Sequence, residues 1–298
     1  MPLAQLRQSL SNVLYGQEEV VDTLLATAVA GGHALLEGLP GLGKTQLARG
    51  FAAASGLSYN RIQFTPDLLP ADVTGTDVWQ DGRFEFRPGP LFAQVVLADE
   101  INRATPKTQS ALLEAMQEGA VTVSGVRHPL PQPFMVIATQ NPIELEGTYP
   151  LPEAQLDRFT AKIEVLPPPP AVWRRILSEP PAEPEPPAEP VELARLRRAA
   201  GAVRAASSAL EAIVNLAQLA SESPHLRFGV SPRGAQAWLA LARGFALLAD
   251  RSYVEWADLR RAARPALIHR LFLTEEARFE GVSEADVLAG LLARAMPE

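Results

Sequence analysis

Apolar residues follow two patterns in the first half of the chain. Short, nearly continuous apolar runs are typical of strands that are buried on both faces of a parallel sheet. The predicted strands, which include both these runs and less apolar candidates, lie at 34–36, 58–63, 94–98, 134–138 and 162–165. Between them, apolar residues at three- and four-residue spacing predict helices at 46–54 and 107–118. Strands that alternate with helices in this way predict an α/β fold with a parallel sheet.

Two pairs of β-prone runs are joined by two-residue turn signals. Residues 78–86 have Asp81-Gly82 at their centre, and residues 121–127 have Ser124-Gly125. Tight hairpin turns need positive φ, which glycine adopts readily, so both segments predict β-hairpins. The passage at 65–72 is rich in proline and aspartate and predicts a loop.

Helical patterns precede the first strand. Leu3, Leu6 and Leu10 predict an N-terminal helix, and Gly16 separates it from a second helix at about 20–28. No apolar run approaches the roughly 18 residues of a membrane span, and the N-terminus lacks the charged-then-apolar order of a signal peptide. We therefore expect a cytoplasmic protein with no membrane span.

The composition changes sharply after the last predicted strand. Ten prolines between 167 and 190 predict a solvated, semi-rigid connection, within which 172–177 can form a short helix. Beyond it the pattern is helical and rich in Ala, Leu and Arg, and Ser231-Pro232 begins one of the helices. The predicted organisation is an α/β core at 1–166, a proline-rich connection at 167–190 and an all-α domain at 191–298.

A glycine-rich stretch between the first strand and its helix has the pattern of a phosphate-binding loop. Glycines let backbone N–H groups converge on a phosphate at a helix N-terminus, Lys44 would reach the β and γ phosphates, and the Thr45 hydroxyl would ligate Mg²⁺. The alternative is a chance glycine-rich turn, which the flanking strand and helix argue against. The candidate nucleotide contacts are Gly38, Pro40, Gly41, Leu42, Gly43, Lys44, Thr45 and Gln46.

Polar residues end two of the predicted buried strands. Asp99 and Glu100 follow the run at 94–98, where Asp99 can hold Mg²⁺ and Glu100 can orient or deprotonate water. Asn141 follows the run at 134–138, which would lie between the other two strands and bring the amide beside the γ-phosphate. The alternatives are an ordinary charged strand end and an Asn-Pro turn.

Composition narrows the class of protein. A chain of 298 residues with 47% apolar residues can bury a large core. It contains no cysteine, which excludes disulfides, thiolate metal sites and cysteine nucleophiles, and its four histidines are scattered. The net charge of −7 counts against a constitutive nucleic-acid binder. It does not exclude one, because an acidic protein that assembles into a ring can still have a locally basic pore.

Four motifs together resemble the MoxR family of AAA+ ATPases, and the resemblance extends over almost the whole chain. They are the loop at 38–45, Val-Val-Leu-Ala-Asp-Glu-Ile-Asn-Arg-Ala at 95–104, Ala-Thr-Gln-Asn-Pro at 138–142 and Leu-Pro-Glu-Ala-Gln-Leu-Asp-Arg-Phe at 151–159. The resemblance implies an AAA+ core with a C-terminal helical lid, assembled as a ring, usually a hexamer, that binds ATP and Mg²⁺ between neighbouring subunits. It also implies that the hairpins at 78–86 and 121–127 are the helix-2 insert and the pre-sensor-1 hairpin.

The resemblance implies roles for single residues. These are Asp99 and Glu100 as Walker B, Asn141 as sensor 1, Arg158 as the arginine finger, Arg233 as sensor 2, and Tyr15 and Gly16 as adenine contacts. A guanidinium supplied by a neighbouring subunit stabilises the charge that develops in phosphoryl transfer. Arg103 is a competing candidate for that role.

Two of these assignments have structural alternatives. Arg158 could instead form an ion pair with Asp157 or Glu153, and Arg233 could face solvent. The connection at 167–190 is richer in proline than the family pattern, which leaves the position of the lid, and with it the role of Arg233, open.

Three functions fit these residues. The first is a remodelling chaperone, and the resemblance implies von Willebrand A domain proteins as partners and roles in metal insertion or complex maturation. The second is a nucleic-acid motor, which the acidic balance and the presence of only three lysines count against. The third is an ATP switch without hydrolysis, which would not need Glu100 or Arg158. No Asn-Lys-x-Asp guanine reader occurs, which argues against GTP.

Overall fold

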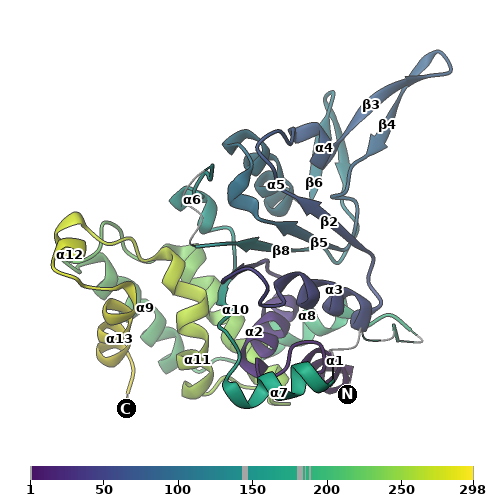
Figure 1. Ribbon diagram of the computed structural model, residues 1–298. Coiled ribbons are helices and arrows are strands. Elements are labelled where there is room, and N and C mark those ends of the chain that lie inside the picture. Colours follow the sequence, from purple (N-terminus) through teal and green to yellow (C-terminus); the bar gives the residue numbers. More distant parts are fainter. Residues whose placement is uncertain (1, 143–146, 180–183, 185, 188, 298) are drawn as a thin grey trace. The chain divides into compact units, whose positions relative to one another are not determined.

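A five-stranded sheet lies at the centre of the part of the chain that carries the predicted motifs (Figure 1). The structure is a computed structural model that describes residues 2–142, 147–179, 184, 186–187 and 189–297. The strand order is β2-β5-β8-β1-β9, and the pairs β2–β5, β5–β8 and β8–β1 are parallel. The strands are β1 Ala34–Glu37, β2 Tyr59–Gln63, β5 Val95–Asp99, β8 Met135–Gln140 and β9 Ala161–Glu164. The predicted α/β fold is confirmed.

Apolar residues on both faces keep the middle of this sheet buried. Every residue of β5 and all but the last of β8 are buried. The helices α3 (Lys44–Ser55) and α5 (Pro106–Glu118) lie on opposite sides of the sheet in Figure 1. Each large apolar side chain that they bury contributes about 1.5–3 kcal/mol. Because β8 lies between β5 and β1, as predicted, the carboxyl ends of these three strands are neighbours.

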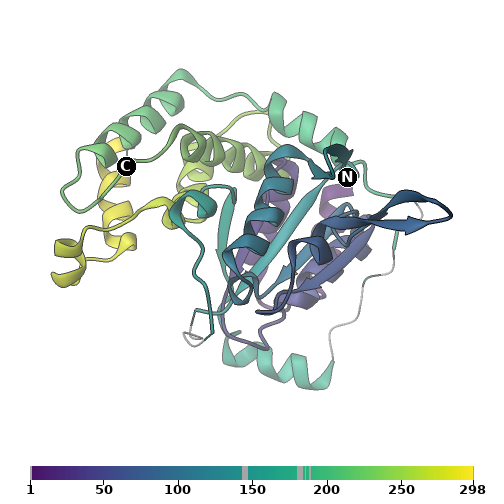
Figure 2. The ribbon, with the colours of Figure 1, turned by 90° about the horizontal axis from the view of Figure 1, so that it is seen from above.

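Both predicted hairpins form. The first consists of β3 (Gly75–Gln80) and β4 (Arg83–Pro88), and it extends away from the sheet in Figures 1 and 2. The second consists of β6 (Ala120–Val123) and β7 (Val126–Pro129). The rings of Phe86 and His128 stack at 3.8 Å between centroids and join the two hairpins.

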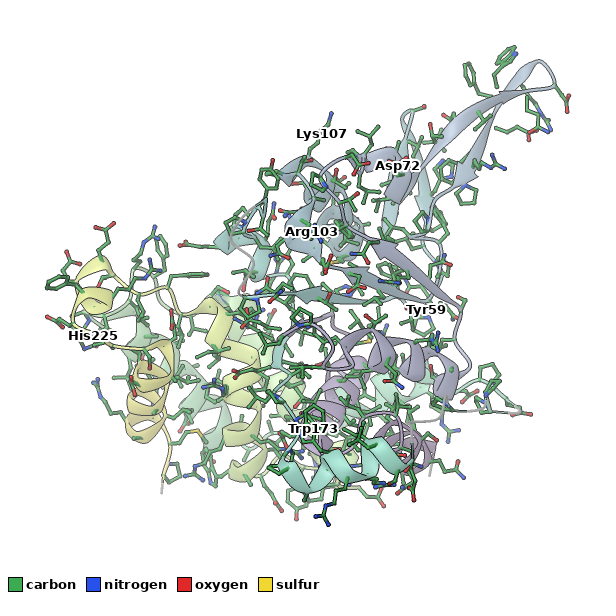
Figure 3. All side chains as sticks on the ribbon, in the orientation of Figure 1. Tyr59, Asp72, Arg103, Lys107, Trp173 and His225 are labelled. Carbon is green, nitrogen blue, oxygen red and sulfur yellow. The ribbon has the colours of Figure 1, made fainter. Side chains whose placement is uncertain are left out.

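The passage predicted to be a loop contains a short helix, so that part of the prediction is wrong. The helix α4 spans Pro70–Thr74 (Figure 3 labels Asp72 on it). Proline at the first helical position already has a helical φ, and the Asp72 carboxylate accepts a hydrogen bond of 2.9 Å from the backbone N–H of Leu69. Val73 is fully buried, and this burial holds the helix in place.

Two helices flank Gly16, as predicted. They are α1 (Pro2–Ser11) and α2 (Glu18–Val29), and Gly16 has a φ of +67°. A Cβ at Gly16 would lie 2.6 Å from Val172 Cγ2, which belongs to α7 (Pro170–Ser178). The short helix predicted inside the proline-rich connection is therefore present, longer than expected, and packed against the Gly16 turn. Its Trp173 is half exposed (Figure 3).

The C-terminal part is all-helical. Its helices are α8 Leu193–Ala202, α9 Ser207–Ser221, α10 Pro232–Leu248, α11 Trp256–Leu267, α12 Glu275–Phe279 and α13 Glu284–Ala295. The hydroxyl of Ser231 caps α10 by accepting a hydrogen bond of 3.0 Å from the N–H of Gly234. The fully buried Trp238 of α10 donates from its indole N–H to the Leu259 carbonyl of α11. Short 3-10 helices at Ile101–Arg103 and Ile268–Arg270 complete the secondary structure of the described residues.

The chain divides into two compact units. The α/β unit contains residues up to Val21, His33–Arg158 and Ile163–Ala194. The helical unit contains Asp22–Gly32, Phe159–Lys162 and Arg195 onward. The boundaries predicted from composition, at 166 and 191, stay a prediction. Among the described residues, no helix is both long enough and apolar enough to cross a membrane.

Gly244 in α10 offers a test of packing within the helical unit. Alanine is favoured over glycine inside a helix by about 1 kcal/mol, but a Cβ at position 244 would lie 2.6 Å from the Ala26 carbonyl oxygen of α2. Overpacking of this kind costs about 1–3 kcal/mol, so we expect Gly244→Ala to lower the melting temperature. Gly290→Ala in α13 is the matched control: it meets open space and should raise stability by about 0.5–1 kcal/mol. Equal stabilisation of both variants in thermal unfolding would contradict this packing.

Candidate active site

A cavity of about 360 Å³ lies where β1, β5 and β8 end. Three segments line it: the glycine-rich loop after β1, the two carboxylates at the end of β5 and the polar end of β8. The lining residues are Pro40, Gly41, Leu42, Gly43, Lys44, Thr45, Gln46, Asp99, Glu100, Thr139, Gln140 and Asn141. The fold thus brings together candidates that lie about 100 residues apart in the sequence.

The glycine-rich loop exposes the N-terminus of α3 to this cavity. Gly41 and Gly43 have φ angles of +80° and +83°, which residues with a Cβ rarely adopt. A Cβ at Gly43 would also lie 2.7 Å from Leu14 Cδ1. No side chain caps the N-terminus of α3. The N–H groups of its first turn are therefore placed to bind an anion such as a phosphate.

The Lys44 ammonium lies inside this loop. Its Nζ donates hydrogen bonds to the carbonyl oxygens of Gly38 at 2.6 Å and Leu39 at 2.7 Å. Partial burial lowers the pKa of Lys44 below its usual range, and the negative charges of Asp99 and Glu100 oppose this shift. Neutral carbonyls hold a cation more weakly than a phosphate does, so Lys44 is well placed to exchange them for phosphate oxygens.

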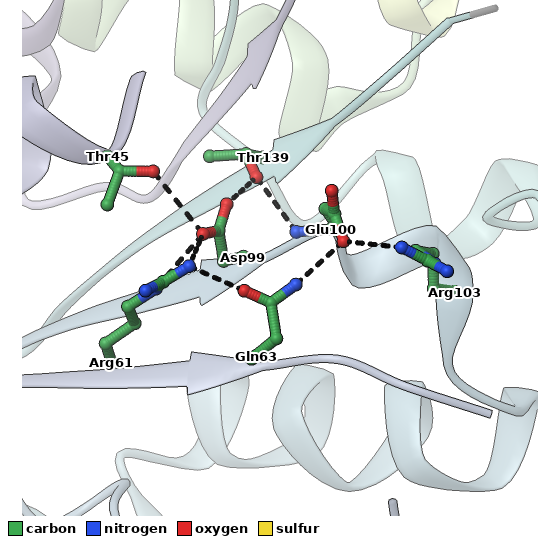
Figure 4. Close-up of polar contacts among 7 residues, drawn as sticks. All are labelled: Thr45, Arg61, Gln63, Asp99, Glu100, Arg103 and Thr139. Carbon is green, nitrogen blue, oxygen red and sulfur yellow. Dashed lines mark hydrogen bonds and ion pairs between the residues drawn. The ribbon is translucent and has the colours of Figure 1, made fainter. Parts of the chain in front are cut away.

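Asp99 accepts hydrogen bonds from three different elements (Figure 4). The Thr139 hydroxyl of β8 donates to Oδ1 at 2.6 Å. The Thr45 hydroxyl of α3 donates to Oδ2 at 3.3 Å. Arg61 of β2 donates to the same Oδ2, from Nη2 at 2.6 Å and from Nε at 3.1 Å. The side chain of Asp99 is only 10% exposed, so these contacts supply most of the solvation that its charge loses.

Glu100 has an unusual backbone and a restrained side chain. Its φ of 56° and ψ of 50° are left-handed, a conformation that costs a residue with a Cβ of order 1 kcal/mol. The backbone N–H donates to Thr139 Oγ1 at 2.9 Å. The carboxylate accepts hydrogen bonds at Oε2 from Gln63 at 2.7 Å and from Arg103 at 3.1 Å. Glu100 lines the same cavity as Asp99.

The end of β8 contributes two amides to the cavity. Asn141 is buried and lines it, as the strand order predicted. Gln140, the last residue of β8, also lines it, and its Nε2 donates to Glu37 Oε1 at 2.5 Å across the β8–β1 pair. This contact fixes the polar end of β8 against the strand that precedes the glycine-rich loop.

The cavity fits Mg²⁺ bound together with phosphates. The Thr45 hydroxyl and the Asp99 carboxylate lie within 3.3 Å of each other, and both are oxygen ligands of the kind that Mg²⁺ prefers. No group of three or more His, Cys, Asp or Glu side chains gathers at one point in the described ranges. Mg²⁺ commonly uses one or two protein oxygens and completes its shell with phosphate oxygens and water, which these two groups allow.

Arg158 lies apart from this cavity. It is half-buried and lines a second cavity of about 300 Å³ with residues of α5 and of α6 (Glu153–Leu156). Its guanidinium forms no ion pair with any residue that the structure describes, so the alternative pairing with Asp157 or Glu153 is not seen there. A half-buried cation without an ion-pair partner among the described residues is available to an anion from outside.

The other two candidate arginines lie in different surroundings. Arg103 (Figure 3) pairs with Glu100 of its own chain at 3.1 Å. Arg233 is exposed at the second position of α10, in the helical unit. Its role as sensor 2 stays a prediction.

The two predicted adenine contacts do not belong to the cavity lining. Tyr15 is buried, and the guanidinium carbon of Arg175 lies 3.9 Å from the centre of its ring. Gly16 packs against Val172. Leu14, beside them in the sequence, contacts Gly43, so this turn adjoins the glycine-rich loop.

The sequence analysis missed three residues of the network. Thr139, Arg61 and Gln63 each hold Asp99 or Glu100. A signal was present, because Arg61 and Gln63 lie two residues apart and so share one face of β2. It could not be interpreted before the structure showed that β2 is the neighbour of β5.

Two protein-family descriptions match the chain. That of the ATPase family associated with various cellular activities (AAA) matches residues 33–161, which contain the glycine-rich loop and the cavity. That of the AAA lid domain matches residues 218–291, within the helical unit.

Individual proteins match over nearly the full length of this chain. The uncharacterized protein YeaC of Bacillus subtilis is 44% identical over 292 residues, covering 96% of this chain and 91% of YeaC. Chaperone MoxR1 of Mycobacterium tuberculosis is 40% identical over 295 residues, covering 94% of this chain and 78% of MoxR1. A solved structure from Cytophaga hutchinsonii, provisionally named an ATPase, has a TM-score of 0.89 and 36% identity, and covers 99% of this chain and 94% of its own.

Thr139 offers a direct test of the network around the two carboxylates. Thr139→Val keeps the shape of the side chain but removes the donor to Asp99 and the acceptor of the Glu100 N–H. Loss of such supporting hydrogen bonds typically costs about 10- to 100-fold in activity, so we expect ATP hydrolysis to slow by that factor. Thr139→Ser, which keeps the hydroxyl, should retain most of the rate. Steady-state phosphate release measures both, and a wild-type rate for Thr139→Val would rule out this role.

Proposed function

The chain belongs to the MoxR family of AAA+ ATPases and is an ATP-hydrolysing enzyme, and we propose that it works as a ring-shaped chaperone that remodels protein partners. In this proposal ATP binds in the cavity at the end of the sheet, and a neighbouring copy completes the site. The position of Arg158 outside the cavity, without an ion pair among the described residues, carries the proposal.

Within one chain, the proposed binding step uses the loop and the first turn of α3. Backbone N–H groups there meet the phosphates, and Lys44 transfers its hydrogen bonds from the Gly38 and Leu39 carbonyls to phosphate oxygens. Thr45 and Asp99 are the proposed ligands of Mg²⁺, which would neutralise charge on the β and γ phosphates. These contacts align the γ-phosphate with the end of β8.

The proposed hydrolytic step uses the two polar strand ends. Glu100 orients the attacking water and accepts its proton, and the buried Asn141 fixes the water and the γ-phosphate on the other side. Both the Gln63 amide and the Arg103 guanidinium donate hydrogen bonds to the Glu100 carboxylate, so its Oε2 atom is already engaged. Glu100 therefore has to leave at least one of them before it acts.

The last proposed component comes from a second copy of the chain. A guanidinium opposite the γ-phosphate can raise the rate by about 10³- to 10⁵-fold when it is supplied in trans. Arg158 has no partner in the described part of its own chain, whereas Arg103 is already paired with Glu100. These surroundings favour Arg158 over Arg103 for that role, and a hexamer is the ring size that the family implies.

Two observations support protein partners. The relative MoxR1 carries the name chaperone. In this chain, Trp79 and Phe84 at the end of the β3–β4 hairpin are 63% and 70% exposed and lie edge to face at 4.9 Å. Exposed aromatic pairs of this kind are typical of protein-binding surfaces. A von Willebrand A domain protein as partner, a role in metal insertion or complex maturation, and the cytoplasm as the location rest on family resemblance and sequence alone.

Mixing two inactive variants tests the shared site. Arg158→Ala keeps its own phosphate-binding loop, and Lys44→Ala keeps its own arginine, so each variant alone should hydrolyse almost no ATP. In rings that mix at random, a site with both parts forms at about one interface in four, so equal amounts should recover about a quarter of the wild-type rate. The measurement is phosphate release before and after mixing, with oligomer mass determined in parallel. Mixed rings that form without any recovery would show that Arg158 does not act in trans.

A further inference from the structure

We propose that Arg61 is the counter-cation of Asp99 in the absence of metal, and that it has to release this carboxylate when Mg²⁺ binds with ATP. Arg61 thereby sets the Mg²⁺ concentration that nucleotide binding needs. The inference rests on the proposed role of Asp99 as the carboxylate that holds Mg²⁺. It adds Arg61 as a residue that competes with the metal for this carboxylate.

Arg61 contacts the same Asp99 oxygen as Thr45, the other residue proposed to hold the metal. Both contacting nitrogens of its guanidinium bond to Asp99 Oδ2, at 2.6 and 3.1 Å. The Thr45 hydroxyl, the other proposed metal ligand, bonds to the same Oδ2 at 3.3 Å. The second oxygen, Oδ1, is engaged by Thr139 on the side of β8. Thr45 and Arg61 therefore share one atom of Asp99, and Mg²⁺ held by Thr45 and Asp99 would compete with the Arg61 guanidinium for this carboxylate.

The charge and the burial of Asp99 explain why the Arg61 guanidinium lies beside it. A carboxylate that is only 10% exposed loses much of its hydration, and a paired guanidinium restores a stabilising interaction. A divalent cation on the same oxygen would be repelled by that guanidinium. The Arg61 side chain is 49% exposed. Its guanidinium can therefore rotate toward the solvent and be hydrated when the metal replaces it. Replacement of one cation by another keeps Asp99 paired throughout.

The same guanidinium connects Asp99 with Glu100 (Figure 4). Arg61 Nη2 also donates to Gln63 Oε1 at 2.6 Å, and Gln63 Nε2 donates to Glu100 Oε2 at 2.7 Å. When Arg61 leaves Asp99, the Gln63 amide loses the donor that orients it. The hold of Gln63 on Glu100 then weakens, so one of the two contacts on this carboxylate is loosened in the state in which Asp99 holds the metal, and that of Arg103 remains.

A Mg²⁺ titration of nucleotide binding tests the inference. The probe is a fluorescent, non-hydrolysable ATP analogue at a fixed concentration, with the full-length chain and increasing Mg²⁺. Arg61→Met, of similar length without the charge, should lower the midpoint Mg²⁺ concentration by about fivefold, the ratio expected for an ion pair with one half-exposed partner. Arg61→Lys, which keeps a cation, should stay closer to wild type. Binding of Mn²⁺ in the presence of the analogue, followed by electron paramagnetic resonance, should show the same order.

The controls separate this inference from the proposed function. Arg83→Met removes an exposed arginine that pairs with Glu85 on the β3–β4 hairpin, and it should leave the midpoint unchanged. If Arg61→Met fails to fold, Arg61→Gln, which keeps a neutral donor, gives the same comparison. An unchanged or raised midpoint in the uncharged variant overturns the role of Arg61 and leaves the proposed function intact. A wild-type protein that does not bind the analogue with Mg²⁺ overturns the proposed function itself.

Discussion

The geometry of the candidate active site depends on the carboxylate of Asp99. Asp99 ends a strand whose residues are all buried, and it accepts hydrogen bonds from α3, β2 and β8. A buried charge that loses one partner costs several kcal/mol, so the strand order and the path of the glycine-rich loop are constrained to bring these donors together. The same constraint places the Glu100 N–H on the Thr139 hydroxyl, and so determines where the second carboxylate lies. In our proposal, nucleotide binding and hydrolysis thus share one polar network at the edge of an apolar sheet.

The charged groups of that network form hydrogen bonds with groups of their own chain. Lys44 bonds to carbonyls of its own loop, Glu100 to Gln63 and Arg103, and Asp99 to Arg61. Each of these contacts is charge-assisted. In our proposal they are exchanged for stronger ones when a phosphate or a cation binds. Arg158 is the exception, because it has no such partner among the described residues. In our proposal its anion is the γ-phosphate of a neighbouring copy, which would make turnover depend on assembly.

The features that depend on local chemistry or on strand order could be predicted from the sequence. The apolar runs identified the strands, Asp81-Gly82 and Ser124-Gly125 identified both hairpins, and the placement of β8 between β5 and β1 followed from the motifs at their ends. The helix α4 was missed because its stability comes from the burial of Val73 and the cap at Asp72, which a Pro- and Asp-rich composition hides. Arg61, Gln63 and Thr139 were missed because their contacts cross between neighbouring strands. Such pairs become visible only when the register of β2 against β5 is known.

The charge of Asp99 is the part of the account that can be tested most directly. Asp99→Asn keeps the size of the side chain and removes its charge, so the affinity for a non-hydrolysable ATP analogue should be measured for both proteins with and without Mg²⁺. The account predicts that Mg²⁺ raises the affinity of the wild-type protein and leaves that of Asp99→Asn nearly unchanged. An Asp99→Asn protein whose affinity rises with Mg²⁺ as much as that of the wild type would contradict it.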